Sequence, residues 1–340
     1  MLNQLDCGSI IPGKSKAPGA FQHVGLAGKI HAACQHLHKP REQYALELPA
    51  RLSAATFSPG GVRSEDINVS VCQAVKDALT ENYLGSASNT SGDKDARNAY
   101  FSKLTENLGA DSPFNHHFQL IIGGACCMLP GILNTFWNHA DSQVLQQLVG
   151  LIYIDVDTDL NSPKDPTSIG TFAGMTMAHF VGLPGALPSM ERFCRSSGGP
   201  VCNASNTVFF GTDMSLPGNK REHFEYLLNN NYHVVSSASV ARGPELRARE
   251  TLAYLEEMVD VIMVHLDVDS IDAGTFPLAN VPNFTGVKFE VMMRALKVFL
   301  GSPKVAGLTI AEVNPDHDPD FLMIEKLASC VADMLGAEST

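Results

Sequence analysis

Short apolar runs recur at intervals from residue 118 to residue 310. Helix-length stretches such as Asn138–Leu148 and Arg247–Met258 separate several of these runs. Strands that are apolar toward both faces and alternate with helices are typical of a parallel sheet covered on each side. The pattern therefore predicts a three-layer α/β/α fold with a mainly parallel sheet. The predicted strands are Phe118–Ile122, Leu151–Ile154, Thr207–Phe210, His233–Val235, Val261–Leu266 and Val305–Ile310.

Two further segments show the spacing of amphipathic helices. Residues 71–83 and Phe321–Leu335 place apolar or small side chains at three- and four-residue intervals. By contrast, about residues 1–65 show no clean period, and we expect an irregular N-terminal part there. A polar segment rich in Gly and Ser predicts a flexible loop near 85–97. No linker divides the chain, so we expect residues 1–340 to form a single domain.

The chain is acidic, with 36 Asp and Glu residues against 24 Lys and Arg, a formal net charge of −12 and a pI near 5.4. This balance argues against broad electrostatic binding of nucleic acid. Apolar residues make up 44% of the chain, which excludes disorder over most of its length. No apolar run approaches the roughly 18 residues that span a bilayer. We therefore expect neither a nucleic-acid partner nor a membrane partner.

Cysteine usage and the first residues bear on the compartment. Eight cysteines are too few for a disulfide scaffold of this length. The opening segment Met1–Asp6 lacks the basic and apolar regions of a secretory signal. Thiols of a protein without such a signal stay reduced in the cytosol. We expect a cytoplasmic protein that acts on a small-molecule substrate.

Alternating acidic residues directly follow two of the predicted strands. Asp155, Asp157 and Asp159 come after one run, and Asp267 and Asp269 come after another. Each Asp alone is an ordinary turn residue or helix N-cap. Ligands of open parallel sheets, however, bind at the carboxyl ends of the strands, where two such clusters would repel each other. A divalent cation offsets that repulsion, and oxygen-rich ligation favours manganese or magnesium over copper or structural zinc.

Four segments in this order resemble the motifs of the ureohydrolase superfamily, which comprises arginases, agmatinases and formiminoglutamases. In that superfamily the motifs read approximately G-G-D-H-S, D-A-H-T-D-L-N-T-P, D-V-D-x-x-D-P and E-x-N-P. The resemblance extends from about residue 115 to about residue 335. The segments that carry it are Gly123–Cys126, Asp155–Pro163, Asp267–Asp272 and Glu312–Pro315.

The resemblance implies a central, mainly parallel eight-stranded sheet, a centre with two Mn²⁺ ions per chain, and a trimeric or hexameric homo-oligomer. In the superfamily a hydroxide bridging the metals attacks an amidino or imino carbon, and a C–N bond is cleaved. Glu312 matches the acidic residue that hydrogen-bonds the substrate guanidinium, and Asn161 and Ser168 are further candidate substrate-binding residues. The positions that match metal ligands are Cys126, Asp155, Asp157, Asp159, Asp267 and Asp269.

Several positions depart from these motifs. Cys126 and Asp157 stand where the superfamily has metal-binding histidines, and Ala125 replaces a carboxylate that orients one of those ligands. Ala173 and Leu216 replace the proton-shuttling His and the Asp that arginases use for the α-amino group. A simple arginase is therefore not expected. Members related to hydroxyarginine hydrolases also carry Cys at the first of these positions, so that change is compatible with function.

Three side chains have more than one interpretation. His317 follows a predicted strand end and is a candidate catalytic proton shuttle, although a surface-loop His is the simpler reading. Cys126 is a candidate metal ligand, or alternatively a nucleophile whose pKa a helix N-terminus lowers. His265 lies inside an apolar run, so we expect a buried core histidine.

Two functions from different classes follow from these observations. The first is a metal-dependent hydrolase of a non-peptide C–N bond in a guanidino or amidino compound, which the retained carboxylates support. The second is a catalytically silent protein of the same fold that serves as a binding or scaffold protein, which the changed positions favour. In a third reading the site holds one divalent metal, bound by Asp155, Asp157, Asp267 and Asp269, that acts as a Lewis acid in amidation, cyclisation or another step of specialised metabolism.

Overall fold

The computed structural model describes residues 2–3, 8, 10–35, 45, 47–48, 56–58, 61–82, 118–143, 145–165 and 167–337. Within these residues, six strands of four to seven residues coincide with the six predicted runs. Every pair of neighbours among them is parallel. The strands are β3 (Gln119–Ile122), β4 (Val149–Ile154), β5 (Thr207–Thr212), β6 (His233–Ser236), β7 (Val261–Asp267) and β8 (Val305–Ala311).

The strand order is β2-β1-β3-β8-β7-β4-β5-β6. At one edge, β1 (Leu2–Asn3) and β2 (Glu47–Leu48) contribute only two residues each. The expected count of eight strands is therefore reached only when these short pairings are included. In the middle of the sheet, β7 lies between β4 and β8. Because the strands are parallel, the carboxyl ends of β3, β8, β7 and β4 lie side by side at one edge.

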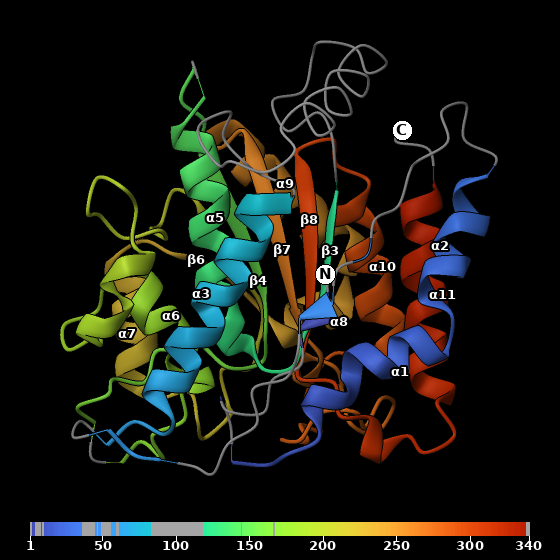
Figure 1. Cartoon of the computed structure of the whole chain (residues 1–340), viewed down its shortest axis with the longest axis horizontal. Helices are drawn as coiled ribbons and strands as arrows, with labels where there is room; N and C mark the ends of the chain where they lie inside the picture. Colours follow the sequence, from blue (N-terminus) through green and yellow to red (C-terminus); the bar gives the residue numbers. More distant parts are fainter. Residues whose placement is uncertain are drawn as a thin grey trace.

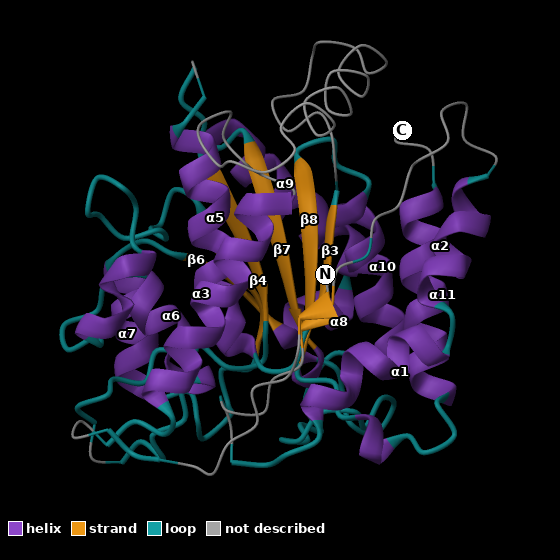
Figure 2. Cartoon of the chain, viewed as in Figure 1, coloured by secondary structure: helices purple, strands orange, loops and turns teal. Residues whose placement is uncertain are grey.

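Helices cover both faces of the sheet, which confirms the predicted three-layer α/β/α architecture (Figure 2). Apolar side chains of the two helix layers pack on opposite faces of the same buried strands. The first layer contains α3 (Glu65–Asn82), α5 (Leu129–Asp141), α6 (Thr176–Phe180) and α7 (Arg221–Asn229). The second contains α1 (Ala17–His23), α2 (Leu26–Cys34), α8 (Ser237–Arg242), α9 (Pro244–Met258), α10 (Phe289–Leu300) and α11 (Leu322–Gly336).

The helix predicted over Asn138–Leu148 is wrong in its bounds. The helix in this part of the chain, α5, starts nine residues earlier and ends at Asp141. Pro130 lies in its first turn, where the missing N–H costs nothing. At the other end, the side chains of Ser142 and Gln143 donate to the carbonyl oxygen of His139 and so compete with continuation of the helix. The helices predicted over residues 71–83, Arg247–Met258 and Phe321–Leu335 correspond to α3, α9 and α11.

The N-terminal part is more regular than the sequence indicated, because α1 and α2 occupy much of residues 17–34. Gly25 separates them in the left-handed conformation with φ +71°, so no single helical period runs through both. In Figure 1, the blue helix α2 lies against the red helix α11. A Cβ atom at Gly336 would lie 2.5 Å from the Ala33 carbonyl oxygen, so glycine permits this close approach. The predicted loop near 85–97 lies outside the described residues.

None of the helices in the described ranges combines the length and apolarity that crossing a bilayer requires.

Candidate metal centre

The predicted acidic clusters lie where the parallel order of the strands brings their ends together. Ile154 pairs with Leu266 across β4 and β7, so Asp155 and Asp267 leave the sheet at the same level. Asp155 is 1% exposed and Asp267 is 3% exposed. Two carboxylates that are this deeply buried need polar or cationic partners.

Part of that need is met locally by the turn that each Asp starts. Asp155 Oδ1 accepts a hydrogen bond of 2.7 Å from the backbone N–H of Asp157. In the same way, Asp267 Oδ1 accepts one of 2.9 Å from the N–H of Asp269. The interpretation as turn residue or N-cap is therefore correct, since Asp155 starts a turn and Asp267 caps the 3₁₀ helix Val268–Ser270, and neither role competes with metal binding. Each carboxylate uses one oxygen for its turn and keeps the other for the site.

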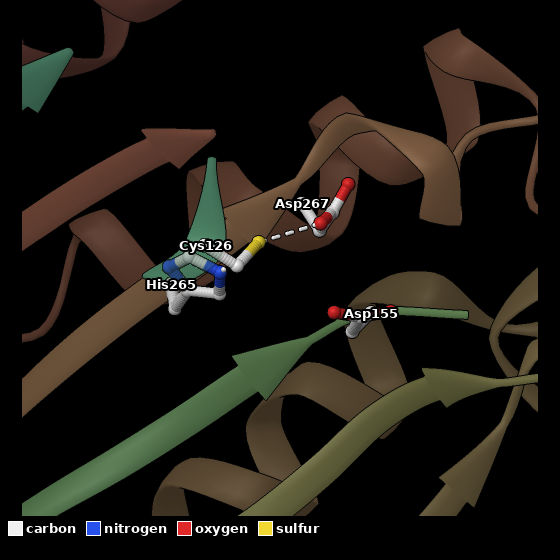
Figure 3. A group of neighbouring side chains, drawn as sticks. All are labelled: Cys126, Asp155, His265 and Asp267. Carbon is white, nitrogen blue, oxygen red and sulfur yellow. Dashed lines mark hydrogen bonds between the residues drawn. The ribbon is translucent and has the colours of Figure 1, made fainter. Parts of the chain in front are cut away.

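Four side chains converge at this edge of the sheet (Figure 3): Cys126, Asp155, His265 and Asp267. One donor atom from each lies within 4.8 Å of all the others, and all four residues are buried. The Cys126 thiol donates to Asp267 Oδ2 at 2.7 Å, and His265 Nε2 lies 3.2 Å from Cys126 Sγ. We call this set the four-donor group. It contains three of the six predicted ligands and one residue that was not predicted as a ligand.

His265 is buried, as expected, but it belongs to this group and not simply to the core. The signal that could have identified it is its spacing from the acidic cluster. His265 precedes Asp267 by two residues on β7, so period-two alternation places both side chains on one face. The alternation was applied only to the Asp residues after the strand and not to the strand itself, so His265 was not predicted as a ligand.

The other predicted ligands surround the four-donor group. Asp159 is 8% exposed and accepts a hydrogen bond from the Tyr153 hydroxyl. Asp269 has one carboxylate oxygen, Oδ1, that is buried without a hydrogen-bond partner among the described residues. Asp157 lies close to Gly218, where a Cβ atom would be 2.9 Å from Asp157 Oδ1. The charges of all three residues act on Asp155, and we call them the outer carboxylates.

Burial and mutual repulsion raise the pKa values of the whole acidic cluster. Burial raises the pKa values of Asp155 and Asp267 well above the usual range, and the charge of Asp269 adds to the shift of both. Burial also raises the pKa of Asp157 to about 6, with a contribution from Asp213. For Asp269, burial and the charge of Asp157 raise the pKa to about 8. A cation in the cluster would relieve this repulsion.

The same field argues against Cys126 as a nucleophile. Burial raises the pKa of the Cys126 thiol well above its usual range, and the neighbouring Asp267, Glu312 and Asp155 raise it further. Cys126 begins a 3₁₀ helix that runs directly into α5, but this helix N-terminus does not offset burial and the neighbouring carboxylates, because the net shift of the Cys126 pKa is upward. Burial also lowers the pKa of His265 to about 3, so the ring is neutral at neutral pH. The thiolate form of Cys126 therefore requires a cation beside it.

Glu312 joins the site from the end of β8, with both carboxylate oxygens engaged. Its Oε1 accepts the backbone N–H of Cys126 at 2.9 Å. Its Oε2 forms an ion pair of 2.8 Å with Lys14, which is completely buried. Burial lowers the pKa of Lys14, but the charge and the hydrogen bond of Glu312, together with the charges of Cys127 and Cys126, outweigh this effect and the net shift is upward. Sequence reasoning missed Lys14, because no local pattern links it to a strand end almost a whole chain away.

The remaining predicted site residues lie outside the four-donor group. His317 is exposed in a short 3₁₀ helix, with Nε2 3.5 Å from Asn314 Nδ2. Asn161 is half-buried, and its backbone N–H donates to Gly174. Ser168 is also half-buried, and its hydroxyl oxygen accepts the N–H of Gly170. Their predicted roles in proton transfer and substrate binding stay predictions.

Comparison with known proteins gives a consistent picture. The model of the arginase family matches residues 49–336. A formimidoylglutamase from Hahella chejuensis is 25% identical over 254 residues, which cover 73% of this chain and 70% of the relative. Arginase-1 from Homo sapiens is 28% identical over 219 residues, covering 63% of this chain and 64% of the relative. The crystal structure of an arginase from Bacillus cereus shares the fold with a TM-score of 0.71 at 16% identity, covering 100% of this chain and 99% of the other.

Proposed function

Because this chain belongs to the arginase family, we propose that it is a metal-dependent hydrolase of a non-peptide C–N bond in an amidino-type small molecule. The observation that carries this proposal is the convergence of Cys126, Asp155, His265 and Asp267 in one buried group. Its curated relatives include formimidoylglutamases and arginases, which are hydrolases of this family. The positions that differ from the superfamily's motifs, Ala173 and Leu216 among them, support a substrate other than that of a simple arginase.

The residues present fit divalent cations. The four-donor group offers sulfur, nitrogen and oxygen donors that lie close enough together to bind one metal ion. Asp269 Oδ1 is a buried carboxylate oxygen that lacks a partner within the described ranges. The resemblance implies two Mn²⁺ ions per chain, and the outer carboxylates of Asp157, Asp159 and Asp269 offer oxygen donors for a second position. A bound divalent ion lowers the pKa of a coordinated water and so supplies a nucleophile at neutral pH.

The protein's own contribution is to hold these donors and to limit water. The donors are at most 3% exposed, so electrostatic interactions among them are weakly screened. Glu312 holds the Cys126 backbone through its Oε1 atom. The Tyr153 hydroxyl holds Asp159. These contacts fix the ligands before any substrate arrives, which is how a preorganised site lowers the barrier of a reaction.

The test is a screen of guanidino and amidino compounds with metal-free protein and with protein loaded with Mn²⁺ or Zn²⁺. Hydrolysis is read as release of urea or ammonia. We expect metal-dependent release from at least one compound. Folded, metal-loaded protein that releases nothing from the whole panel would contradict the proposal.

One observation favours the second candidate, a binding or scaffold protein without turnover. The resemblance assigns Glu312 to the guanidinium of the substrate, yet the ammonium of Lys14 occupies its Oε2 atom. A cation of the chain itself thus stands where the cation of an arginase substrate would bind. A substrate of this protein would have to displace Lys14 or lack a positive charge at that place.

Lys14→Met separates the two candidates, and Lys16→Met is its matched control. Lys16 also pairs with an acidic residue, Asp316, but its side chain is 61% exposed. If Lys14 blocks an active site, Lys14→Met will bind guanidinium compounds at least about tenfold more tightly than wild type, and Lys16→Met will not. If both variants and the wild type bind and hydrolyse nothing, the scaffold function is supported.

Three expectations from the sequence stay proposals beside this function. We propose that residues 1–340 form one domain, that the protein is cytoplasmic, and that it forms a trimer or hexamer. Light scattering of the purified full chain would test the oligomeric state directly, and a monomeric mass would contradict it.

A further inference from the structure

His265 occupies an unusual place for a core histidine. It is fully buried, and its Nε2 atom lies 3.2 Å from the Cys126 thiol, which in turn contacts Asp267. Figure 3 shows the ring beside Cys126 on the strand that also carries Asp267, with Asp155 facing them from the neighbouring strand. Three strand ends thus bring one thiol, one imidazole and two carboxylates into a single space.

We infer that His265 is a metal ligand, and that Cys126, Asp155, His265 and Asp267 together bind a zinc-class ion in preference to manganese. This inference rests on the proposed function only in that both use the same edge of the sheet. Donor atoms around a tetrahedral zinc ion lie roughly 3.3–3.7 Å apart, given bonds of about 2.0–2.3 Å. The four donors lie within 4.8 Å of one another, so small side-chain movements bring them to that spacing.

The choice of metal follows from the donors. Thiolate and imidazole are ligands that zinc prefers, whereas manganese prefers sites made of carboxylates, carbonyls and water. Among the carboxylates at positions that match metal ligands, Asp159 already accepts a hydrogen bond from the Tyr153 hydroxyl. His265 supplies a nitrogen donor beside Cys126. The four-donor group therefore offers one sulfur, one nitrogen and two oxygens, in place of the oxygen-rich set that the acidic clusters alone predict.

Neighbouring side chains hold the imidazole in place. The Tyr153 ring stacks on His265, with centroids 5.1 Å apart and an interplanar angle of 12°. Thr309 pairs with His265 across β7 and β8. Its hydroxyl and His265 Nδ1 are both buried without a hydrogen-bond partner in the part of the chain that the structure describes. A metal-bound His usually donates through its other nitrogen, and these two unpartnered groups lie at paired positions of neighbouring strands.

The test uses the full chain, stripped of metal and then mixed with equal amounts of Zn²⁺ and Mn²⁺. Bound metal is measured by mass spectrometry after gel filtration for wild type, His265→Gln and His179→Gln. His179 is a matched control, because it is also a buried histidine stacked on an aromatic ring, with centroids 5.2 Å apart and an interplanar angle of 12°. It does not belong to the four-donor group.

We expect wild type and His179→Gln to take up zinc in preference to manganese, and His265→Gln to lose at least about tenfold in zinc affinity. A second measurement needs no variant and therefore stands even if His265→Gln fails to fold. X-ray absorption of zinc-loaded wild type should show one sulfur at about 2.3 Å and an imidazole nitrogen at about 2.0 Å.

Three results would overturn the inference: preferential uptake of manganese, unchanged zinc affinity in folded His265→Gln, or an absorption spectrum without imidazole. Manganese uptake together with metal-dependent hydrolysis would overturn it while leaving the proposed hydrolase standing. Failure to bind either metal would overturn both.

Discussion

The ends of β4 and β7 carry the same three residues, Asp-Val-Asp, and share one backbone hydrogen bond, although a 3₁₀ helix follows only β7. In both, the first Asp is buried and caps the backbone N–H of the second through its Oδ1 atom. Both continue from neighbouring strands, in which Ile154 pairs with Leu266. The two strand ends therefore share this Asp-to-backbone hydrogen bond.

The two strands differ two residues before the first Asp, where β4 has Tyr153 and β7 has His265. The two rings stack on each other, but they act on different neighbours. The Tyr153 hydroxyl donates to Asp159, whereas His265 approaches the Cys126 thiol. The repeated motif thus supplies one buried carboxylate from each strand. Tyr153 and His265 determine which further side chains lie beside those carboxylates. Four predictions test this comparison.

The largest effect is expected from removing the first carboxylate at either strand end. Asp155→Asn and Asp267→Asn should each weaken metal binding by at least about 100-fold and abolish metal-dependent hydrolysis. Asp267→Asn should be the more severe, because Asp267 Oδ2 also accepts from Cys126. Calorimetric titration measures the affinities. Asp165→Asn, which breaks a pair with Lys220, is the control and should bind metal like the wild type. Equal, small losses would show that neither strand end holds metal.

Tyr153→Phe should lower the metal-free stability by about 1–3 kcal/mol, because it leaves the buried Asp159 without its donor. The phenyl ring can still stack on His265, so the preference among metals should remain. Denaturant unfolding measures the stability. Tyr254→Phe removes a hydrogen bond to the neutral Ala204 carbonyl and should cost less. A larger loss in Tyr254→Phe would contradict this assignment.

The metal-free chain should lose stability as the pH rises from 7 to 9. Folding raises the pKa of Asp269 to about 8 from about 3.9 in the unfolded chain. The stabilisation of the folded state by protonated Asp269 is complete below about pH 4. It declines as the pH rises, and the last part is lost as the pH passes through 8. We expect a Tm about 3 °C lower at pH 9, and bound metal should remove most of the difference.

The interval starts at pH 7 because buried histidines give the opposite trend at lower pH. Burial lowers the pKa of His179 to about 4 and that of His265 to about 3, so their stabilising contributions grow as the pH rises toward about 6.5. Above pH 7 they no longer change. A metal-free Tm that rises between pH 7 and pH 9 would show that the acidic cluster does not control stability.

The smallest effect is expected at β8, next to His265. Thr309→Val should raise metal-free stability by up to about 1 kcal/mol, because it removes a buried hydroxyl without a partner among the described residues. It should also weaken zinc binding a few-fold if Thr309 supports the imidazole. Thr212→Val removes a similarly unpartnered hydroxyl and should change stability alone. Identical zinc affinities in both variants would exclude a role for Thr309.

The sequence was most informative where one short segment carries both a fold signal and a chemical signal. The run before Asp155 and the run before Asp267 predicted strands, and parallel order then predicted that the two residues meet. The helix over Asn138–Leu148 was misplaced because side-chain bonds to the His139 carbonyl, which no apolar period reveals, end α5 early. Contacts between distant segments, such as the ion pair of Lys14 with Glu312, lie beyond any local pattern.

The position of Lys14 has a practical consequence for handling this protein. Asn280 and Asn314 donate to the carbonyl oxygens of Ile11 and Pro12, and so tie the segment that carries Lys14 to the end of β8. A chain trimmed to residues 49–336, the span of the family match, would lose this tether and leave Glu312 without its counter-charge. Assays on chains shortened in this way would therefore report on an altered metal centre, in which Glu312 lacks the partner it has in the full chain.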